Sequence, residues 1–291
     1  MSEPETPPAP RAVQDGRVVA LALEGTARLQ LVHATGVCAE VARRHGLQGR
    51  AQGLAAELLV ANALMAAWVK GEERVQLQLQ SERPQVSFFG EVDGDGNCRA
   101  RLAPPRVAGE GLAVDGVLLA IKADATREMY RGVTAVEGET IEEALRRHLQ
   151  QSDQVTAFVR IAVDPAGRRA AGFVMERLPI VGDDEDVVQA MFETAVDRLS
   201  SLAPEEILDG LAEGRLLTED LVELERQPLR FACACSRDRV ERMLLALGPA
   251  ELADMLARDG GATVTCHFCT EVYRFDGDAL QRLAAVGAPE A

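Results

Sequence analysis

The chain has 291 residues, a formal net charge of −15 and a hydrophobic fraction of 47%. This length and apolar content suffice for one large domain and a smaller one, with a buried core. The acidic balance argues against a general nucleic-acid binder, which needs clustered lysine and arginine, and against binding to an anionic membrane surface.

The N-terminal residues Met1–Pro10 are acidic and rich in proline, without the apolar stretch of a secretory signal. We expect residues 1–12 to form a disordered tail. The longest apolar run, Leu54–Val69, contains Glu57 and Asn62 and is short for a bilayer span. These features predict a cytoplasmic protein, in a compartment that keeps thiols reduced.

Residues 13–178 are predicted to form an α+β domain with a mixed arrangement of sheet and helices. In Glu73–Gln80 apolar residues alternate with glutamines, which is the period of a half-buried strand. Gln52–Lys70 has an apolar stripe at helical spacing, and a capping box of Thr140 and Glu143 precedes a helix. That helix is expected at Ile141–Gln150, and further strands at Val86–Val92, Cys98–Leu102, Val117–Ala123, Met129–Val136, Val155–Val163 and Ala170–Arg177.

The turn Asp93–Asn97 has the sequence DGDGN and resembles the start of a calcium-binding loop. The sixth position of such a loop is Cys98 here instead of glycine, and the twelfth is Pro104 instead of glutamate. A hairpin turn is therefore the better interpretation.

Residues 179–230 carry most of the negative charge, with fourteen Asp and Glu against two Arg in Gly182–Glu225. Amphipathic spacing predicts helices at Val187–Leu202 and Pro204–Leu211, and Thr218 can cap a third. We interpret this segment as an acidic helical linker. A stable helical subdomain is an equally weighted alternative.

Residues 231–276 are predicted to form a small module that contains four cysteines. Ser236 can cap a helix at Arg237–Leu247, which Gly248 and Pro249 end. A second helix at Ala250–Arg258 and two strands at Ala262–Cys266 and Glu271–Phe275 are expected to follow. Residues 277–291 are interpreted as a C-terminal tail.

The four cysteines of this module form two close pairs, Cys233 with Cys235 and Cys266 with Cys269, separated by thirty residues. Zinc prefers tetrahedral sulfur ligands at about 2.3 Å, and two such pairs can complete a site. Four protein ligands leave no open position for water or substrate. The pattern therefore predicts one structural Zn²⁺ ion per chain instead of a catalytic one.

Three other residues of types that can bind metal or be oxidised are interpreted as having no role in the metal site. His267 could replace a ligand, but with four cysteines present we expect it to lie beside the site or in solvent. Cys38 and Cys98 have no partner pattern and are interpreted as buried apolar residues.

A module of this kind can act as a redox switch because of its size. At roughly 45 residues it is near the limit at which a hydrophobic core alone rarely suffices. Structural zinc supplies roughly 10–16 kcal/mol in small finger peptides. Oxidation of the thiolates should therefore release the metal and unfold the module.

The cysteine motifs resemble the signature of the 33 kDa chaperonin family of redox-regulated heat-shock chaperones. The motifs are FACACSRDR, starting at Phe231, and Cys266-His267-Phe268-Cys269. Four upstream segments fit the same family, in order: Leu54–Leu64 (LAAELLVANAL), Val75–Gln80 (VQLQLQ), Tyr130–Ile141 (YRGVTAVEGETI) and the chain from Phe173 onward. The resemblance covers the chain from about Val13 to Asp276, and Cys98 is a thiol that the family does not require.

The resemblance implies a substrate-binding domain, a metastable linker and a C-terminal zinc domain. It implies a holdase, not an enzyme, that binds unfolded client proteins and prevents their aggregation under oxidative stress. Zinc is implied to be bound while the four cysteines are reduced. On oxidation they are implied to form the disulfides Cys233–Cys235 and Cys266–Cys269, after which the linker unfolds and the protein forms a homodimer.

The residues themselves also bear on enzymatic activity. The chain has only two lysines, Lys70 and Lys122, and neither follows a glycine, so the usual phosphate-binding loop is excluded. No catalytic constellation is evident. An ATP-independent binding protein is therefore expected.

Two other functions fit part of the sequence. A zinc-ribbon nucleic-acid factor would need a basic face, but Arg230–Asp276 has six Arg against seven acidic residues. A thiol–disulfide oxidoreductase using Cys266 and Cys269 would need a βαβ context, which is not predicted, and would leave the other cysteine pair unexplained. The redox-regulated chaperone, without nucleic-acid or membrane partners, is the preferred hypothesis.

Overall fold

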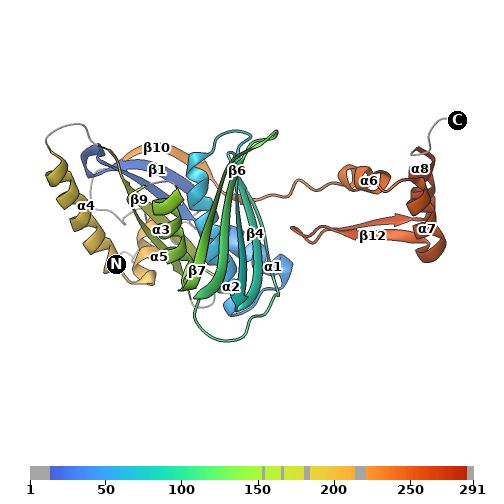
Figure 1. The fold of residues 1–291 in the computed structure, drawn as a ribbon, viewed down its shortest axis with the longest axis horizontal. Helices are drawn as coiled ribbons and strands as arrows, with labels where there is room; N and C mark the ends of the chain where they lie inside the picture. Colours follow the sequence, from blue (N-terminus) through green and yellow to red (C-terminus); the bar gives the residue numbers. More distant parts are fainter. Residues whose placement is uncertain (1–13, 153–154, 165–166, 180–183, 214–220, 287–291) are drawn as a thin grey trace, which may run out of the picture. The chain divides into compact units, whose positions relative to one another are not determined.

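The computed structural model describes residues 14–152, 155–164, 167–179, 184–213 and 221–286. The chain divides into two compact units, Met1–Phe231 and Ala232–Ala291, which we call the N-terminal and C-terminal units. The N-terminal unit combines two sheets with helices, so the predicted α+β class is confirmed (Figure 1).

One sheet of the N-terminal unit has five antiparallel strands in the order β10-β1-β2-β9-β8. The strands are β1 (Gly16–Ala22), β2 (Ala27–His33), β8 (Ala157–Val163), β9 (Ala170–Arg177) and β10 (Val222–Pro228). The strands predicted at Val155–Val163 and Ala170–Arg177 are confirmed as β8 and β9, which pair antiparallel. The hairpin of β1 and β2, which turns through the 3-10 helix η1 (Leu23–Gly25), lies where the sequence pattern predicts no individual element.

The other sheet has six strands in the order β11-β5-β4-β3-β6-β7. They are β3 (Arg74–Arg83), β4 (Gln85–Asp93), β5 (Asn97–Ala103), β6 (Val114–Ala123), β7 (Glu128–Glu139) and β11 (Arg230–Phe231). The alternation predicted for β3 is confirmed, since Val75, Leu77 and Leu79 are buried and the glutamines between them are half-buried. The Asp93 carboxylate accepts backbone N–H bonds from Asp95 and Asn97, so the turn is a hairpin connection.

Helix α2 (Arg50–Met65) packs against strands of both sheets. Almost every residue of α2 is buried, so the single apolar stripe expected from its spacing is too narrow a description. Among the described residues, only Arg50–Trp68, which includes the 3-10 helix η2 (Ala66–Trp68), is long and apolar enough to cross a membrane. Because 83% of its apolar window is buried inside the unit, it has the burial of a core helix.

Two more helices, α1 (Thr35–His45) and α3 (Ile141–Ser152), complete the packing around α2. The predicted capping box at the start of α3 is present. The Glu143 N–H donates to Thr140 Oγ1 at 3.3 Å, and the Thr140 N–H donates to the Glu143 carboxylate at 2.8 Å.

The acidic region contains two of its predicted helices, α4 (Glu185–Ser200) and α5 (Pro204–Glu213). Their apolar residues share a core cluster with the five-stranded sheet, as Phe192 and Ile207 do with Phe173. The cap proposed at Thr218 lies outside the described residues. Residues 179–230 were expected to be a helical linker without strands, but Val222–Pro228 pairs with β1 as β10.

A single segment, Val222–Phe231, joins both sheets, because β10 belongs to one and β11 to the other. We call it the bridging segment. Between the two strands, the Leu229 N–H donates to the Asp15 carbonyl at 3.1 Å, and the Arg230 N–H donates to the Gly96 carbonyl at 3.0 Å. The chain therefore stays bonded to the N-terminal unit almost up to Cys233.

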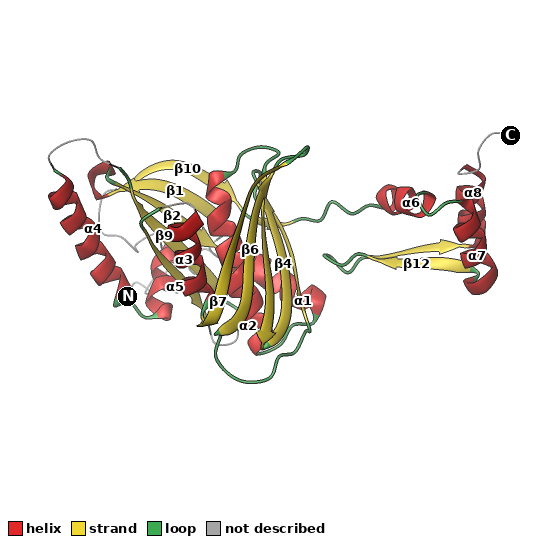
Figure 2. Cartoon of the chain, viewed as in Figure 1, coloured by secondary structure: helices red, strands yellow, loops and turns green. Residues whose placement is uncertain are grey.

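The C-terminal unit contains the predicted two helices and strand pair. They are α6 (Arg237–Leu245), α7 (Pro249–Asp259), β12 (Gly261–Thr265) and β13 (Val272–Asp276), with α8 (Gly277–Val286) following (Figure 2). A tail was expected from residue 277, but residues 277–286 form α8, which packs on α7 because Leu280 and Ala279 enter the core.

Candidate metal centre

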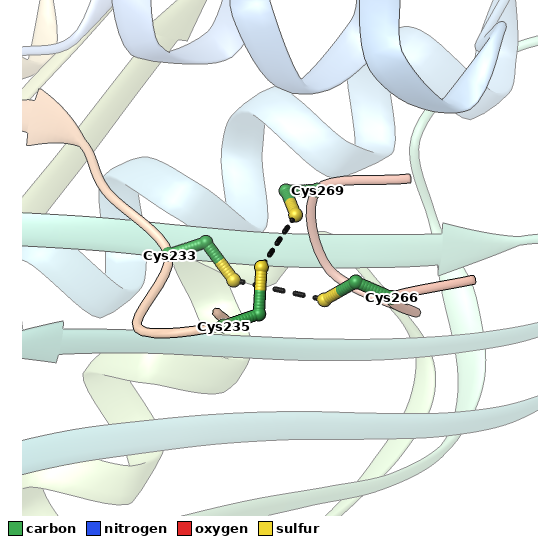
Figure 3. Close-up of side chains that lie close together, drawn as sticks. All are labelled: Cys233, Cys235, Cys266 and Cys269. Carbon is green, nitrogen blue, oxygen red and sulfur yellow. Dashed lines mark hydrogen bonds between the residues drawn. The ribbon is translucent and has the colours of Figure 1, made fainter. Parts of the chain in front are cut away.

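Two loops of the C-terminal unit bring four thiols together. Cys233 and Cys235 precede α6, and Cys266 and Cys269 lie in the turn between β12 and β13. All four Sγ atoms lie within 4.8 Å of one another. The side chains point toward a common centre, with Sγ atoms 3.7 Å apart for Cys233 and Cys266 and 3.1 Å apart for Cys235 and Cys269 (Figure 3).

Local backbone structure fixes both loops. The predicted cap of α6 is confirmed, because Ser236 Oγ accepts the Arg239 N–H at 3.2 Å directly after Cys235. In the second loop the Cys266 N–H donates to the Glu271 carbonyl and the Thr270 N–H donates to the Cys266 carbonyl, both at 2.9 Å. Thr270 adopts the left-handed region with φ 59°, which closes this turn.

The separations of the sulfur atoms suit a tetrahedral metal ion. With metal–sulfur distances of about 2.3 Å, as for zinc, the sulfur atoms of a tetrahedral site lie about 3.8 Å apart. The two separations given above are 3.7 and 3.1 Å, and none of the separations exceeds 4.8 Å. The four cysteines can therefore hold a metal ion with small adjustments of their side chains.

The thiols differ in how easily they ionise. Burial raises the pKa of Cys266, but N–H groups of Cys269 and Phe268 stabilise its thiolate and lower the pKa to about 7. Burial and the neighbouring Cys235 thiol raise the pKa of Cys269, and burial raises the pKa of Cys233. A bound metal cation lowers the pKa of its cysteine ligands, because it binds the thiolate form.

Tyr273 is a contact of this centre that the sequence analysis did not include. Its hydroxyl donates to Cys235 Sγ at 3.1 Å, and the hydrogen bond to Cys235 raises the pKa of the tyrosine. Tyr273 lies in the strand predicted at Glu271–Phe275, which follows the Cys266–Cys269 turn. Because side chains alternate along a strand, the sequence could have indicated which residues of this strand face the cysteines.

The remaining candidates lie outside the cluster. His267 is exposed and is not one of its four members. Cys38 and Cys98 are 3% and 2% exposed in the N-terminal unit, as expected of buried apolar residues. Burial raises the pKa of both thiols, that of Cys98 to about 12, so neither is prone to oxidation at neutral pH.

Comparisons with known proteins agree on one family. The profile of the family described as Hsp33 protein matches residues 15–276. The 33 kDa chaperonin of Geobacter sp. (strain M21) is 32% identical, with 93% of this chain and 97% of the relative covered. That of Bacillus subtilis (strain 168) is 28% identical, with 92% and 98% covered.

A solved structure shares the fold. The crystal structure of the 33 kDa chaperonin (heat shock protein 33 homolog) from Thermotoga maritima superimposes with a TM-score of 0.75. It covers 94% of this chain and 98% of its own, at 20% sequence identity. The chain therefore has an already known fold.

Proposed function

The chain belongs to the Hsp33 protein family, and we propose that it is an ATP-independent holdase chaperone controlled by the redox state of its four clustered cysteines. The observation that carries the proposal is the convergence of four thiols within 4.8 Å in a unit with a small core. In the reduced state Cys233, Cys235, Cys266 and Cys269 bind one Zn²⁺ ion, and the protein is inactive. In the oxidised state it binds unfolded clients and forms a homodimer.

Zinc supplies folding free energy to the C-terminal unit, roughly 10–16 kcal/mol by analogy with small finger peptides. Hydrogen peroxide accepts two electrons for each disulfide and is reduced to water, while two thiols lose their protons and join. We assign the disulfides to Cys233–Cys235 and Cys266–Cys269. Each partner is within reach, because all four sulfur atoms lie within 4.8 Å.

Unfolding of the C-terminal unit then affects the acidic residues 179–230 through the backbone that connects them. Phe231, at the end of the bridging segment, is separated from Cys233 by one residue. We assign residues 13–178 to client binding, 179–230 to a linker that unfolds on activation, and 231–276 together with α8 to the switch, because α8 contributes Leu280 to the core of the C-terminal unit. Like charges in the linker repel one another and lower its stability.

The proposal is tested by the aggregation of a chemically unfolded client, with the full chain added in its reduced zinc form or after peroxide. We expect suppression only by the oxidised form. A Cys266→Ser/Cys269→Ser variant should lose zinc and its dependence on oxidant, while Cys38→Ser should behave as wild type. Equal suppression in both redox states of wild type would contradict the redox control, and no suppression in either would contradict the chaperone.

The order of oxidation is a separate test. Cys266–Cys269 should form before Cys233–Cys235, because a disulfide between cysteines one residue apart closes a smaller and more strained ring. Timed alkylation after peroxide, with mass mapping, gives the order directly. Formation of Cys233–Cys235 first, or client binding while zinc is fully retained, would contradict this sequence of events.

The linker assignment predicts a change in hydrogen exchange. After oxidation, amides of α4 and α5 should lose protection before those of β3, because locally unstable segments open first. Protection of α4 and α5 that is equal in both redox states would support the alternative, a stable helical subdomain.

A further inference from the structure

The N-terminal unit contains a second candidate site, a cavity of about 310 Å³. It lies against the inner face of the six-stranded sheet, where Val75, Lys122 and Tyr130 are neighbours on β3, β6 and β7. Its other walls come from η2, the end of α2 and Val155, just before β8, and its lining includes Met65, Trp68, Val75, Ala120 and Tyr130. Two aromatic rings and a thioether thus face one space.

The cations around this cavity already have acidic partners. Lys122 Nζ lies 3.3 Å from the Glu73 carboxylate and donates to the Trp68 carbonyl at 2.8 Å. The Arg28 guanidinium lies 5.5 Å from the centre of the Trp68 ring and donates to Glu176 at 2.8 Å. An uncharged group is therefore the preferred occupant, because a charged one would lose its hydration without an available counter-ion.

The walls are held in place before anything binds. The bond from Lys122 to the Trp68 carbonyl ties η2 to the sheet. Tyr130 packs edge-on against the His148 ring, with centroids 6.4 Å apart, and His148 is buried with Thr134 Oγ1 2.9 Å from its Nδ1 atom. A preformed apolar site of this kind loses little entropy on binding.

The volume indicates the size of the occupant. An apolar cavity of about 150 Å³ binds benzene, so a cavity of about 310 Å³ has room for a substituted or bicyclic aromatic group. Aromatic rings and the thioether of methionine both favour aromatic partners. We propose that this cavity is a binding pocket for one uncharged aromatic side chain of an unfolded client. This inference rests on the proposed chaperone function and names a contact that the function would use.

Trp68 allows a direct test, because it is the only tryptophan in the chain. The probe is N-acetylphenylalanine amide, added to the full chain while acrylamide quenching of Trp68 fluorescence is measured. We expect the probe to reduce quenching in a saturable manner. Ala120→Leu fills the cavity and Val155→Phe narrows it from another side, and both should abolish the effect while the far-ultraviolet circular dichroism is retained.

The matched control is Val133→Phe, on β7. Val133 is 60% exposed and points to the opposite face of the sheet from Tyr130, by the alternation of the strand. This variant should bind the probe as wild type does. No saturable protection in wild type, or equal protection in folded Ala120→Leu and Val155→Phe, would overturn the pocket.

The client step is tested with the same variants after peroxide. We expect Ala120→Leu and Val155→Phe to require about tenfold more protein than wild type or Val133→Phe for the same suppression of client aggregation, the ratio that a loss of about 1.4 kcal/mol represents. Suppression by the occluded variants equal to that by wild type would overturn the inference and leave the chaperone function intact. Failure of wild type itself to suppress aggregation would overturn the proposed function, while the quenching result would still decide whether the pocket binds an aromatic group.

Discussion

The two units of this chain are stabilised in different ways. In the N-terminal unit, α2 is buried on nearly all sides among strands of two sheets, and the buried core extends through α1, α2, α3 and both sheets. The core cluster of the C-terminal unit, within its described residues, is small: Val240, Leu244, Leu252, Ala262, Phe275, Ala279 and Leu280. Hydrophobic burial can stabilise the first unit alone, whereas the second lies near the size at which a core is marginal.

This difference explains why a redox switch would be placed in the second unit. An oxidant converts thiolates to disulfides, but it leaves buried leucine side chains unchanged. A unit whose stability depends on a thiolate cluster therefore unfolds on oxidation, whereas a unit stabilised by its core stays folded. Each prediction below changes one unit and uses the other as its reference.

The largest effect is expected from removing two zinc ligands. Cys266→Ser/Cys269→Ser should remove most of the roughly 10–16 kcal/mol that structural zinc supplies, and the C-terminal unit should unfold. Hydrogen exchange should show lost protection in β12 and unchanged protection in β3. Zinc content should fall from one ion per chain, whereas Cys38→Ser should retain it. Protected β12 amides in the zinc-free variant would mean that the small core suffices.

The N-terminal unit should be most sensitive at Arg17, which is 1% exposed. Its guanidinium lies 3.3 Å from the Glu225 carboxylate and donates to the Gln227 side chain and the Ala66 carbonyl. Arg17→Met removes a donor from the Ala66 carbonyl and the half-buried Gln227 side chain, while the Glu225 carboxylate, 39% exposed, stays in contact with solvent, and we expect a loss of about 2–4 kcal/mol. Urea unfolding followed by Trp68 fluorescence measures it.

The control for Arg17 is Arg226→Met. Arg226 is 67% exposed and pairs with Glu223 at 2.6 Å on the same strand, β10. Its replacement should change the free energy of unfolding by about 0.5 kcal/mol or less. Equal effects of the two variants would show that the bridging segment is not held by Arg17, and zinc content should be normal in both.

A smaller effect concerns pH. Glu57, on α2, is 6% exposed, and burial together with the nearby Glu142 and Glu143 carboxylates raises its pKa to about 8, although the Ile141 N–H donates to it. It is therefore protonated in the folded state at neutral pH and ionised in the unfolded state, where the pKa is about 4.3. The stability that this group contributes is present at low pH and decreases as pH rises toward about 8, by about 1.4 kcal/mol per pH unit.

Glu57→Gln isolates this dependence. Between about pH 5.5 and about pH 7.5, wild type should lose about 3 kcal/mol more unfolding free energy than the variant, in urea titrations followed by Trp68 fluorescence. The C-terminal unit should respond in the opposite direction, because zinc binding releases protons and strengthens as pH rises. Parallel pH profiles of wild type and Glu57→Gln would contradict the protonated state of Glu57.

The sequence predicted the elements that have strong local signals. The alternation in β3, the capping box of α3 and the cap of α6 at Ser236 each depend on residues close together in the chain. The four thiols were also predictable, because the spacing of cysteines limits their possible ligand geometry. For these features the local pattern and the tertiary environment favour the same structure.

The features that were missed depend on distant partners. Val222–Pro228 is a strand because β1 pairs with it, although about two hundred residues separate them. Gly277–Val286 is a helix because Leu280 fits the small core of the C-terminal unit. The contact of Tyr273 with Cys235 and the cavity beside Trp68 also exist only once separate elements have packed.

The smallest effect is expected from the loss of one helix N-cap, which can be compared between the two units. Ser236 caps α6 and Thr140 caps α3, and replacing either by alanine should cost about 1 kcal/mol. In the N-terminal unit Thr140→Ala should lower the urea midpoint slightly and leave zinc binding unchanged. The proposed function couples folding of the C-terminal unit to metal binding, and α6 begins directly after Cys235, so Ser236→Ala should weaken zinc affinity about fivefold. Competition with a chromogenic chelator measures this ratio. An unchanged affinity in Ser236→Ala would mean that the C-terminal unit is folded before zinc binds. The two units would then differ much less in how they are stabilised than the sizes of their cores suggest.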